Sequence, residues 1–474
     1  MMKLRNSFFY IILFFTVFYI QFESYATAED QEKDKSRNSL YPPPFLVEKE
    51  NHWVDSVFES LSFDQKIAQL FMISAYSNRG GINDAHANNI ELLIKQYNIG
   101  GLIFMQGGPM QQAKLTNYYQ SIAKTPLMIG IDAEWGLQMR LDSTIGFPKQ
   151  MMLGAIEDET LIYAMATEIA QQCKRIGIHI NFAPVVDINS NPLNPVINTR
   201  SFGENKENVL SKSLHYMTGL QNNGILAVAK HFPGHGDTDK DSHKELPTIL
   251  HDKKRLDTLE LYPYYGLIKN GLGGVMVAHL HIPKIDNSVL LPASLSPAIT
   301  KNLLQNHLKF KGLIFTDALN MQGVTGNYEY GEIEVQALIA GNDVLLFSQD
   351  VPTAIEKIKD AINNKIIKKN DIERKCKKIL LAKYWMGLNN LKKIELQNLY
   401  EDLNTVKAKK LSKKLYEASF TIIKNNNDII PFKQLDTLSF QQLLLVQVPK
   451  MNFKKHLSTM QNVKPIKPEV ILLK

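Results

Sequence analysis

Residues 226–243 read LAVAKHFPGHGDTDKDSH, an apolar run that passes directly into a polar loop. The run Leu226–Phe232 is short and apolar, which is typical of a strand buried in a sheet. One proline and two glycines follow within residues 233–236 and end the strand. Lys230 and His231 stand at the carboxyl end of the run. The stretch therefore predicts a buried strand that carries ionisable side chains to one edge of a sheet.

Similar apolar runs recur along the chain, and amphipathic stretches separate them. The other runs are Leu70–Ser74, Gly101–Phe104, Leu127–Asp132, Ile180–Asp187, Gly274–His279, Gly312–Asp317 and Asp343–Phe347. Apolar residues at helical spacing predict helices at Ala87–Tyr97, Glu159–Gly177, Glu207–Asn222 and Leu256–Lys269. Strands that alternate with helices pair in parallel, and eight such units predict an α/β fold, the (β/α)₈ TIM-like barrel. An open doubly wound sheet is the alternative, but residues 101–108 match its glycine-rich phosphate turn poorly.

Ionisable residues follow these runs in a series. Asp132, Asp187, Lys230, His231, His279 and Asp317 each stand at or near a carboxyl end. In a barrel of this kind the carboxyl ends of the strands form the catalytic face. A single polar residue after a strand is commonplace, whereas a series of them indicates an active site.

The 474 residues exceed one ordinary domain and divide into four predicted parts. Two basic residues, an apolar run and Ala26-Thr27-Ala28 indicate a signal peptide over residues 1–28, with an uncleaved membrane anchor as the alternative. Residues 29–48 read as a linker and residues 49–390 as the barrel. Residues 391–474 read as the start of an incomplete C-terminal α/β sandwich domain. We expect an exported protein, periplasmic or extracellular, with no stable membrane anchor after cleavage.

Composition excludes several classes of protein. The only cysteines are Cys173 and Cys376, so the chain has no disulfide framework and no Cys/His metal motif. The net charge of +7 comes from a basic C-terminal part. Its lysines alternate with apolar residues at helical spacing and no aromatic series accompanies them, which favours a solvated face over a nucleic-acid site.

The loop after Lys230 and His231 is the densest polar cluster. His243 lies two residues after Asp241, a spacing at which the carboxylate can hydrogen-bond the imidazole and favour its protonated form. A general acid that works near neutral pH needs this arrangement. A metal site formed by His231, His235, His243 and the loop aspartates is the competing interpretation, and a solvated loop without function is the third.

Three further positions carry candidate chemistry. Asp317 ends an apolar run, where a carboxylate can attack an anomeric carbon; the alternative is an N-cap for a helix over residues 318–324. Asp132 and Arg140 offer hydrogen bonds to sugar hydroxyls, and nearby Trp135 is a stacking surface or a core side chain. Arg200 is either a cation that faces the pocket or a surface arginine.

Together these clusters resemble glycoside hydrolase family 3, in its β-N-acetylglucosaminidase branch, over about residues 50–390. The loop is similar to the KHFPGHG…DSH motif of that branch, and the resemblance implies that Asp241 and His243 form the acid/base pair. It also implies that Asp317 is the nucleophile. The implied sugar-binding residues are Asp132, Arg140, Arg200, Lys230 and His231, with Asp187 in support. Trp135 departs from the Glu-Gly-Gly that many members have, which leaves the aglycone open.

The resemblance implies a retaining hydrolase that removes terminal β-linked N-acetylglucosamine from peptidoglycan-derived or related glycans. Phosphate in place of water as acceptor is a variant of this chemistry. No metal, cofactor or nucleic acid is expected. A metal-dependent barrel hydrolase and a catalytically inactive protein that binds wall glycans remain as alternatives.

Overall fold

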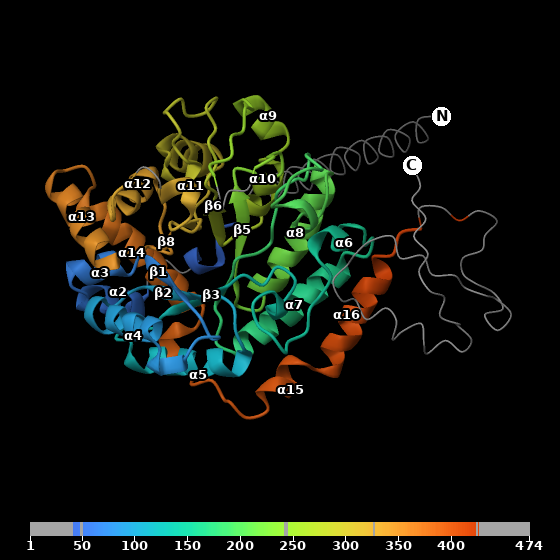
Figure 1. Cartoon of the computed structure of the whole chain (residues 1–474), viewed down its shortest axis with the longest axis horizontal. Coiled ribbons are helices and arrows are strands. Elements are labelled where there is room, and N and C mark those ends of the chain that lie inside the picture. Colours follow the sequence, from blue (N-terminus) through green and yellow to red (C-terminus); the bar gives the residue numbers. More distant parts are fainter. Residues whose placement is uncertain (1–40, 48–50, 241–244, 326–327, 423–424, 426–474) are drawn as a thin grey trace, which may run out of the picture. The chain divides into compact units, whose positions relative to one another are not determined.

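Eight parallel strands form the centre of the molecule in the computed structural model, which describes residues 41–47, 51–240, 245–325, 328–422 and 425 (Figure 1). The strands are β1 Phe71–Ala75, β2 Gly101–Phe104, β3 Met128–Ile131, β4 Ile180–Asn181, β5 Leu226–Phe232, β6 Gly274–Val277, β7 Leu313–Thr316 and β8 Leu345–Leu346. Their order is β7-β6-β5-β4-β3-β2-β1-β8. A parallel bridge between Phe315 and Val344 joins the two end strands. The predicted (β/α)₈ barrel is therefore confirmed.

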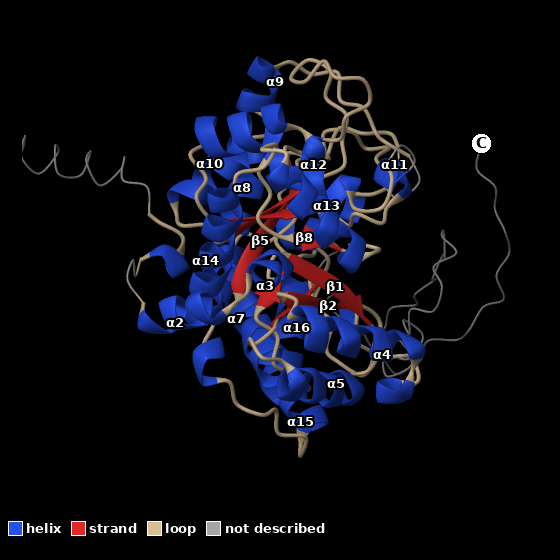
Figure 2. Cartoon of the chain, turned by 90° about the vertical axis from the view of Figure 1, so that its left-hand side faces the viewer, coloured by secondary structure: helices blue, strands red, loops and turns tan. Residues whose placement is uncertain are grey.

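Helices enclose the strands, as Figure 2 shows by colour. They are α2 His52–Ser60, α3 Phe63–Ala68, α4 Ala85–Leu92, α5 Pro109–Ile122, α6 Gln150–Gly154, α7 Thr160–Arg175, α8 Lys206–Gln221, α9 Lys253–Thr258, α10 Tyr262–Lys269, α11 Gln322–Thr325, α12 Glu332–Ala340, α13 Val351–Asn363 and α14 Lys369–Trp385. Local sequence sets their ends: Ser62 and Gln65 form a capping box at the start of α3, where each side chain satisfies a free backbone N–H.

Aromatic side chains fill the interior of the barrel. The rings of Phe182 and Phe315 meet edge to face, with their centroids 5.4 Å apart. A Cβ at Gly130 would come within 2.7 Å of the Phe182 ring, so glycine on β3 makes room for that ring. The barrel is thus a packed core rather than a channel, and chemistry is confined to its rim.

Two predicted elements differ from the structure. The run 180–187 is a continuous strand only at Ile180 and Asn181, and further along Val185 forms an isolated parallel bridge with Lys230. Pro184, which has no N–H to donate to a neighbouring strand, interrupts the run between them. The predicted helix Leu256–Lys269 is two helices, α9 and α10. Pro263 stands in the first turn of α10, where its missing N–H costs no helical hydrogen bond, so a new helix begins there.

The compact unit that contains the barrel extends to Ser419, beyond the predicted boundary at residue 390. Helices α15 (Leu399–Leu403) and α16 (Val406–Ala418) both contact α7. Arg175 on α7 pairs with Asp402 at 2.8 Å, and Leu415 is fully buried. These contacts explain why residues 391–419 fold with the barrel. The second unit begins at Phe420.

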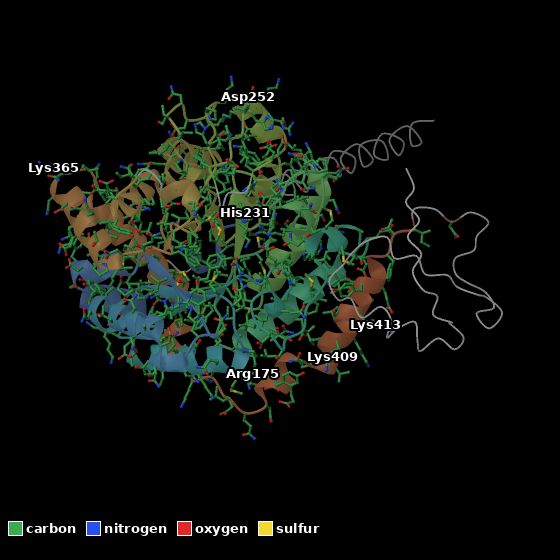
Figure 3. The ribbon with its side chains drawn as sticks, in the orientation of Figure 1. Arg175, His231, Asp252, Lys365, Lys409 and Lys413 are labelled. Carbon is green, nitrogen blue, oxygen red and sulfur yellow. The ribbon has the colours of Figure 1, made fainter. Side chains whose placement is uncertain are left out.

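Most of the predicted terminal segments lie outside the described residues. These are the signal peptide, all of the linker except residues 41–47, and most of the predicted second domain. Within the described ranges, no helix combines the length and apolar character needed to cross a membrane. Lysines of the C-terminal part, such as Lys365 and Lys409, lie at the periphery of the fold, whereas His231 lies in its interior (Figure 3).

The junction between β7 and β8 contains a buried ion pair. Asp343 accepts hydrogen bonds from the backbone N–H of Ile314 at 3.0 Å and from Lys378 Nζ at 2.6 Å. Because Asp343 precedes β8, this pair lies at the amino ends of the strands, opposite the catalytic face.

Candidate active site

The carboxyl ends of β3, β5 and β7 bring the predicted residues to one rim of the barrel. Asp132 directly follows β3, Lys230 and His231 lie within β5, and Asp317 directly follows β7. Two cations come from connecting segments: Arg140 follows the short 3₁₀ helix Leu137–Met139, and Arg200 ends another at Asn198–Arg200.

Asp132 is held between two cations. Its carboxylate accepts from Arg140 Nη2 at 2.5 Å and from Lys230 Nζ at 2.7 Å. Burial by itself would raise the pKa of Asp132, but the charges of Lys230 and Arg140 outweigh it and lower the pKa well below the usual value. Asp132 is therefore an ionised acceptor with a fixed orientation, which suits a pair of sugar hydroxyls.

Glu134 joins the same network, although its sequence pattern predicts no role for it. Its fully buried carboxylate accepts from Arg200 in a bidentate pair, at 3.1 Å from Nε and 2.7 Å from Nη2. Lys230 Nζ lies 2.9 Å from the same carboxylate. Burial opposes ionisation, but the charges of Arg200 and Lys230 lower the pKa of Glu134 to about 2. Arg200 is thus directed inward, and the surface interpretation of this residue is excluded.

Asp187 sets the tautomer of His231. Burial would raise the pKa of Asp187, but the charge of His231 and hydrogen bonds to it lower the pKa, so the carboxylate accepts and does not donate. It lies 2.7 Å from His231 Nδ1, which must therefore carry the proton. The other ring nitrogen, Nε2, is then free to accept from Arg200 Nη2 at 3.3 Å. Asp187 thereby fixes both the ring and its tautomer.

The same carboxylate also fixes the start of the polar loop. Asp187 accepts from the backbone N–H of His235 at 2.7 Å, and Asn194 donates to the carbonyl of His235 at 2.8 Å. Gly236 lies so close to the main chain that an added Cβ would meet the carbonyl oxygen of Ile188 at 1.7 Å. Glycine here allows the loop to lie directly on the segment that follows β4.

His235 is buried in this loop beside the rim. Its ring Nδ1 lies 2.8 Å from Thr238 Oγ1. Burial lowers the pKa of His235 to about 4, so the ring is neutral near pH 7. The negative charges of Asp187 and Asp317 act on this ring in the opposite direction, but burial outweighs them.

Asp317 does not cap a helix that begins at the next residue. Helix α11 begins only at Gln322, whereas Asp317 Oδ1 accepts from the N–H of Ala318 at 2.8 Å. His279 supports this turn, because its Nε2 lies 3.0 Å from the carbonyl oxygen of Ala318. The side chain of Asp317 is partly exposed at the catalytic face. The geometry excludes the capping alternative and is compatible with a nucleophile.

Asp241 and His243 lie outside the described residues, so their pairing stays a prediction. His231 Nδ1 is directed to Asp187 and His235 Nδ1 to Thr238. The histidine-loop metal site also requires His243, so it stays an alternative. Trp135 is half-buried, and Lys149 Nζ lies 5.3 Å from its ring centroid.

Comparison with known proteins agrees with this geometry. Residues 62–382 match the glycosyl hydrolase family 3 N-terminal domain. Beta-hexosaminidase A of Pseudoalteromonas piscicida is 37% identical over 291 residues, which span 56% of this chain and 48% of that protein. Beta-hexosaminidase LpqI of Mycobacterium tuberculosis is 30% identical over 338 residues, or 68% of this chain and 83% of that protein.

A solved structure gives the same result. The glycoside hydrolase family 3 beta-N-acetylglucosaminidase of a Paenibacillus species superposes with a TM-score of 0.70 at 36% identity, covering 76% of this chain and 69% of that chain. The chain therefore belongs to glycoside hydrolase family 3.

Proposed function

We propose that this protein is an exported retaining glycoside hydrolase that removes terminal β-linked N-acetylglucosamine from peptidoglycan-derived or related glycans. The observation that carries the proposal is the network that links Asp132, Glu134, Lys230, Arg200 and His231 at the rim of the barrel where Asp317 follows β7. A set of fixed donors and acceptors around a partly exposed carboxylate suits a sugar ring placed over a nucleophile. The relatives include beta-hexosaminidases and a beta-N-acetylglucosaminidase, which supports the choice of substrate.

In the proposed mechanism, Asp317 attacks the anomeric carbon while His243, paired with Asp241, gives its proton to the leaving oxygen. The bond to the leaving oxygen breaks as a glycosyl ester forms on Asp317. Neutral His243 then takes a proton from water, and the resulting attack releases the sugar and restores the carboxylate. The remaining side chains bind and orient the sugar and form no covalent bond with it. They are Asp132, Arg140, Lys230, Arg200 and His231.

The test compares hydrolysis of p-nitrophenyl N-acetyl-β-glucosaminide with that of the matching β-glucoside by the purified protein, with EDTA present. Release from the N-acetylated substrate alone is the expected result. Turnover that disappears with EDTA and returns with zinc would instead favour the metal-dependent alternative. Sugar binding without any turnover would establish the inactive binding protein.

Two variants test the assigned roles. Asp317→Asn should lower kcat by on the order of a thousandfold or more at unchanged thermal stability, because the covalent step is lost. His243→Ala should lower kcat by about 10²- to 10⁴-fold on chitobiose and much less on a dinitrophenyl glycoside, whose leaving group needs no proton. An Asp317→Asn protein with full turnover contradicts the mechanism.

Export is tested separately. N-terminal sequencing of protein recovered from the periplasm or the medium should begin at Glu29, after the Ala26-Thr27-Ala28 site. A retained N-terminus in a membrane fraction would favour the uncleaved anchor.

A further inference from the structure

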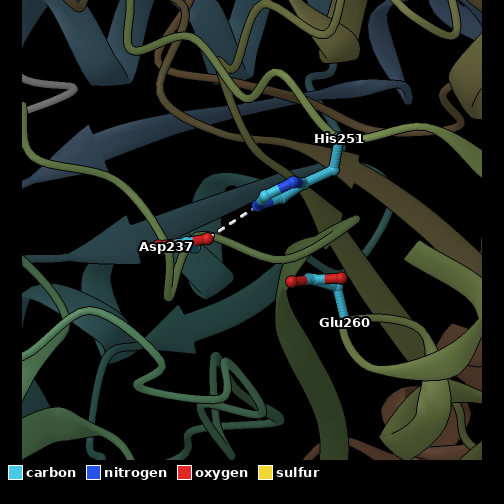
Figure 4. Close-up of side chains that lie close together, drawn as sticks. All are labelled: Asp237, His251 and Glu260. Atoms are coloured by element: carbon cyan, nitrogen blue, oxygen red, sulfur yellow. Dashed lines mark hydrogen bonds and ion pairs between the residues drawn. The ribbon is translucent and has the colours of Figure 1, made fainter. Parts of the chain in front are cut away.

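A second cluster of ionisable side chains lies outside the sugar-binding network. Asp237 lies in the loop after β5, His251 precedes α9, and Glu260 lies in the turn between α9 and α10. One ligand atom from each residue lies within 4.8 Å of the others. Figure 4 shows the three side chains converging, and His251 Nε2 lies 2.6 Å from Asp237 Oδ2. These residues play no part in the mechanism described above.

The buried carboxylate of Glu260 has fewer hydrogen bonds than its two oxygens can accept. Its side chain is only 3% exposed, and Oε2 has no hydrogen-bond partner among the described residues. An ionised group in this position is costly unless it is paired. Arg255 is the nearby cation, with Nη2 3.2 Å from Glu260 Oε1 and 3.8 Å from Asp237 Oδ2. The guanidinium of Arg255 therefore faces two carboxylates, and the buried Oε2 of Glu260 has no hydrogen-bond partner among the described residues.

We propose that Asp237, His251 and Glu260 bind a divalent transition-metal ion, with Zn²⁺ as the best match. An imidazole nitrogen with two carboxylate oxygens suits zinc, whereas magnesium and calcium prefer oxygen ligands alone. Tetrahedral zinc places neighbouring ligand atoms roughly 3.3 Å apart, so small side-chain movements from the present arrangement form the site. Water supplies the remaining position.

Arg255 competes with the ion. Its side chain is 38% exposed and can turn toward solvent when a metal takes over the pairing of both carboxylates.

The bound ion would connect the loop after β5 to the segment that leads into α10. It would join residues 237, 251 and 260, and the sequence between the first two contains Asp241 and His243. Because the ligands meet only in the folded chain, the ion raises thermal stability. Neither effect depends on the proposed glycosidase activity.

The test uses the full chain without a polyhistidine tag and Co²⁺ as a spectroscopic probe. We expect one Co²⁺ per chain with the absorption of a tetrahedral site, displacement of Co²⁺ by Zn²⁺, and a higher Tm. Glu260→Gln, which keeps the shape of the side chain, should weaken Zn²⁺ binding at least about tenfold. Arg255→Gln should strengthen it, since the competing charge is gone.

His243→Ala is the control, because the predicted acid/base pair is another possible ligand set. It should keep the tetrahedral Co²⁺ spectrum. Loss of binding in His243→Ala together with full binding in Glu260→Gln would overturn the proposal and place the ion at the acid/base pair. Absence of Co²⁺ and Zn²⁺ binding to the parent chain would overturn it directly. If Glu260→Gln does not fold, Asp237→Asn replaces it, since Asp237 is partly exposed and its loss should weaken binding equally.

Discussion

Replacement of Asp187 by asparagine tests whether the tautomer of His231 matters for the reaction. The carboxylate receives the proton-bearing Nδ1 of His231 at 2.7 Å and the N–H of His235 at 2.7 Å. Asparagine has one acceptor oxygen, which the backbone N–H groups will retain. Its amide nitrogen then faces His231 Nδ1 and forces the ring proton onto Nε2. That proton points at the Arg200 guanidinium, which is also a donor.

The expected decrease in kcat/KM follows from the loss of the hydrogen bond between Arg200 and His231. A hydrogen bond to a charged group contributes about 1.5–3 kcal/mol. At about 1.36 kcal/mol for each factor of ten, kcat/KM should fall about 10- to 150-fold if His231 and Arg200 orient the sugar. Stability should fall by a similar free energy. The assay is steady-state hydrolysis of p-nitrophenyl N-acetyl-β-glucosaminide, beside thermal unfolding.

Asp343→Asn is the matched control. Asp343 is also a buried, ion-paired aspartate, but it lies at the amino ends of the strands. Its replacement should lower stability and leave kcat/KM unchanged. Asp187→Asn with unaltered kcat/KM would refute the tautomer argument, and an equal loss in both variants would show that destabilisation alone is responsible.

Two further predictions follow from burial. Burial lowers the pKa of both His179 and His235 to about 4, so each is neutral in the folded chain while the unfolded chain binds protons below about pH 6.5. Stability should therefore be lost as pH falls from about 6.5 to 4, by about 3 kcal/mol for each ring, and His179→Gln should unfold with a smaller decrease in Tm between pH 7 and pH 4.5 than the parent. Gly236→Ala should displace the loop, because its Cβ would meet the Ile188 carbonyl at 1.7 Å, and should lower kcat/KM. Gly80→Ala, with ordinary 3.5 Å contacts, should leave kcat/KM unchanged, and equal effects of the two alanines would contradict the packing argument.

The sequence predicted the strands well because each is a compact apolar run. Leu226–Phe232 and Gly101–Phe104 match β5 and β2 at both ends. The strand that begins at Ile180 was predicted too long. The run 180–187 is largely apolar, but Pro184 cannot donate a hydrogen bond to a neighbouring strand, and a hydrophobic pattern does not record this. Helix α10 was merged with α9 for a related reason, because apolar periodicity continues through the turn that separates them.

The site was predicted in part. Asp132, Lys230 and Arg200 meet as expected, since strand ends converge on one rim. Glu134 was missed because its partner Arg200 is 66 residues away and only the fold brings the two together. Its position two residues after Asp132 was the available signal. Asp241 and His243 stay predictions.

The floor of the site has a balanced charge. Asp132, Glu134 and Asp187 face Arg140, Lys230 and Arg200, and His231 Nδ1 donates to Asp187. The fields of such paired charges largely cancel at a distance. Salt at 0.1 M screens the remaining field beyond about 10 Å. A neutral glycan therefore arrives by unguided diffusion and meets strong, oriented dipoles only at contact. Capture should be nearly independent of ionic strength, and the floor does not concentrate anions from the surrounding solution.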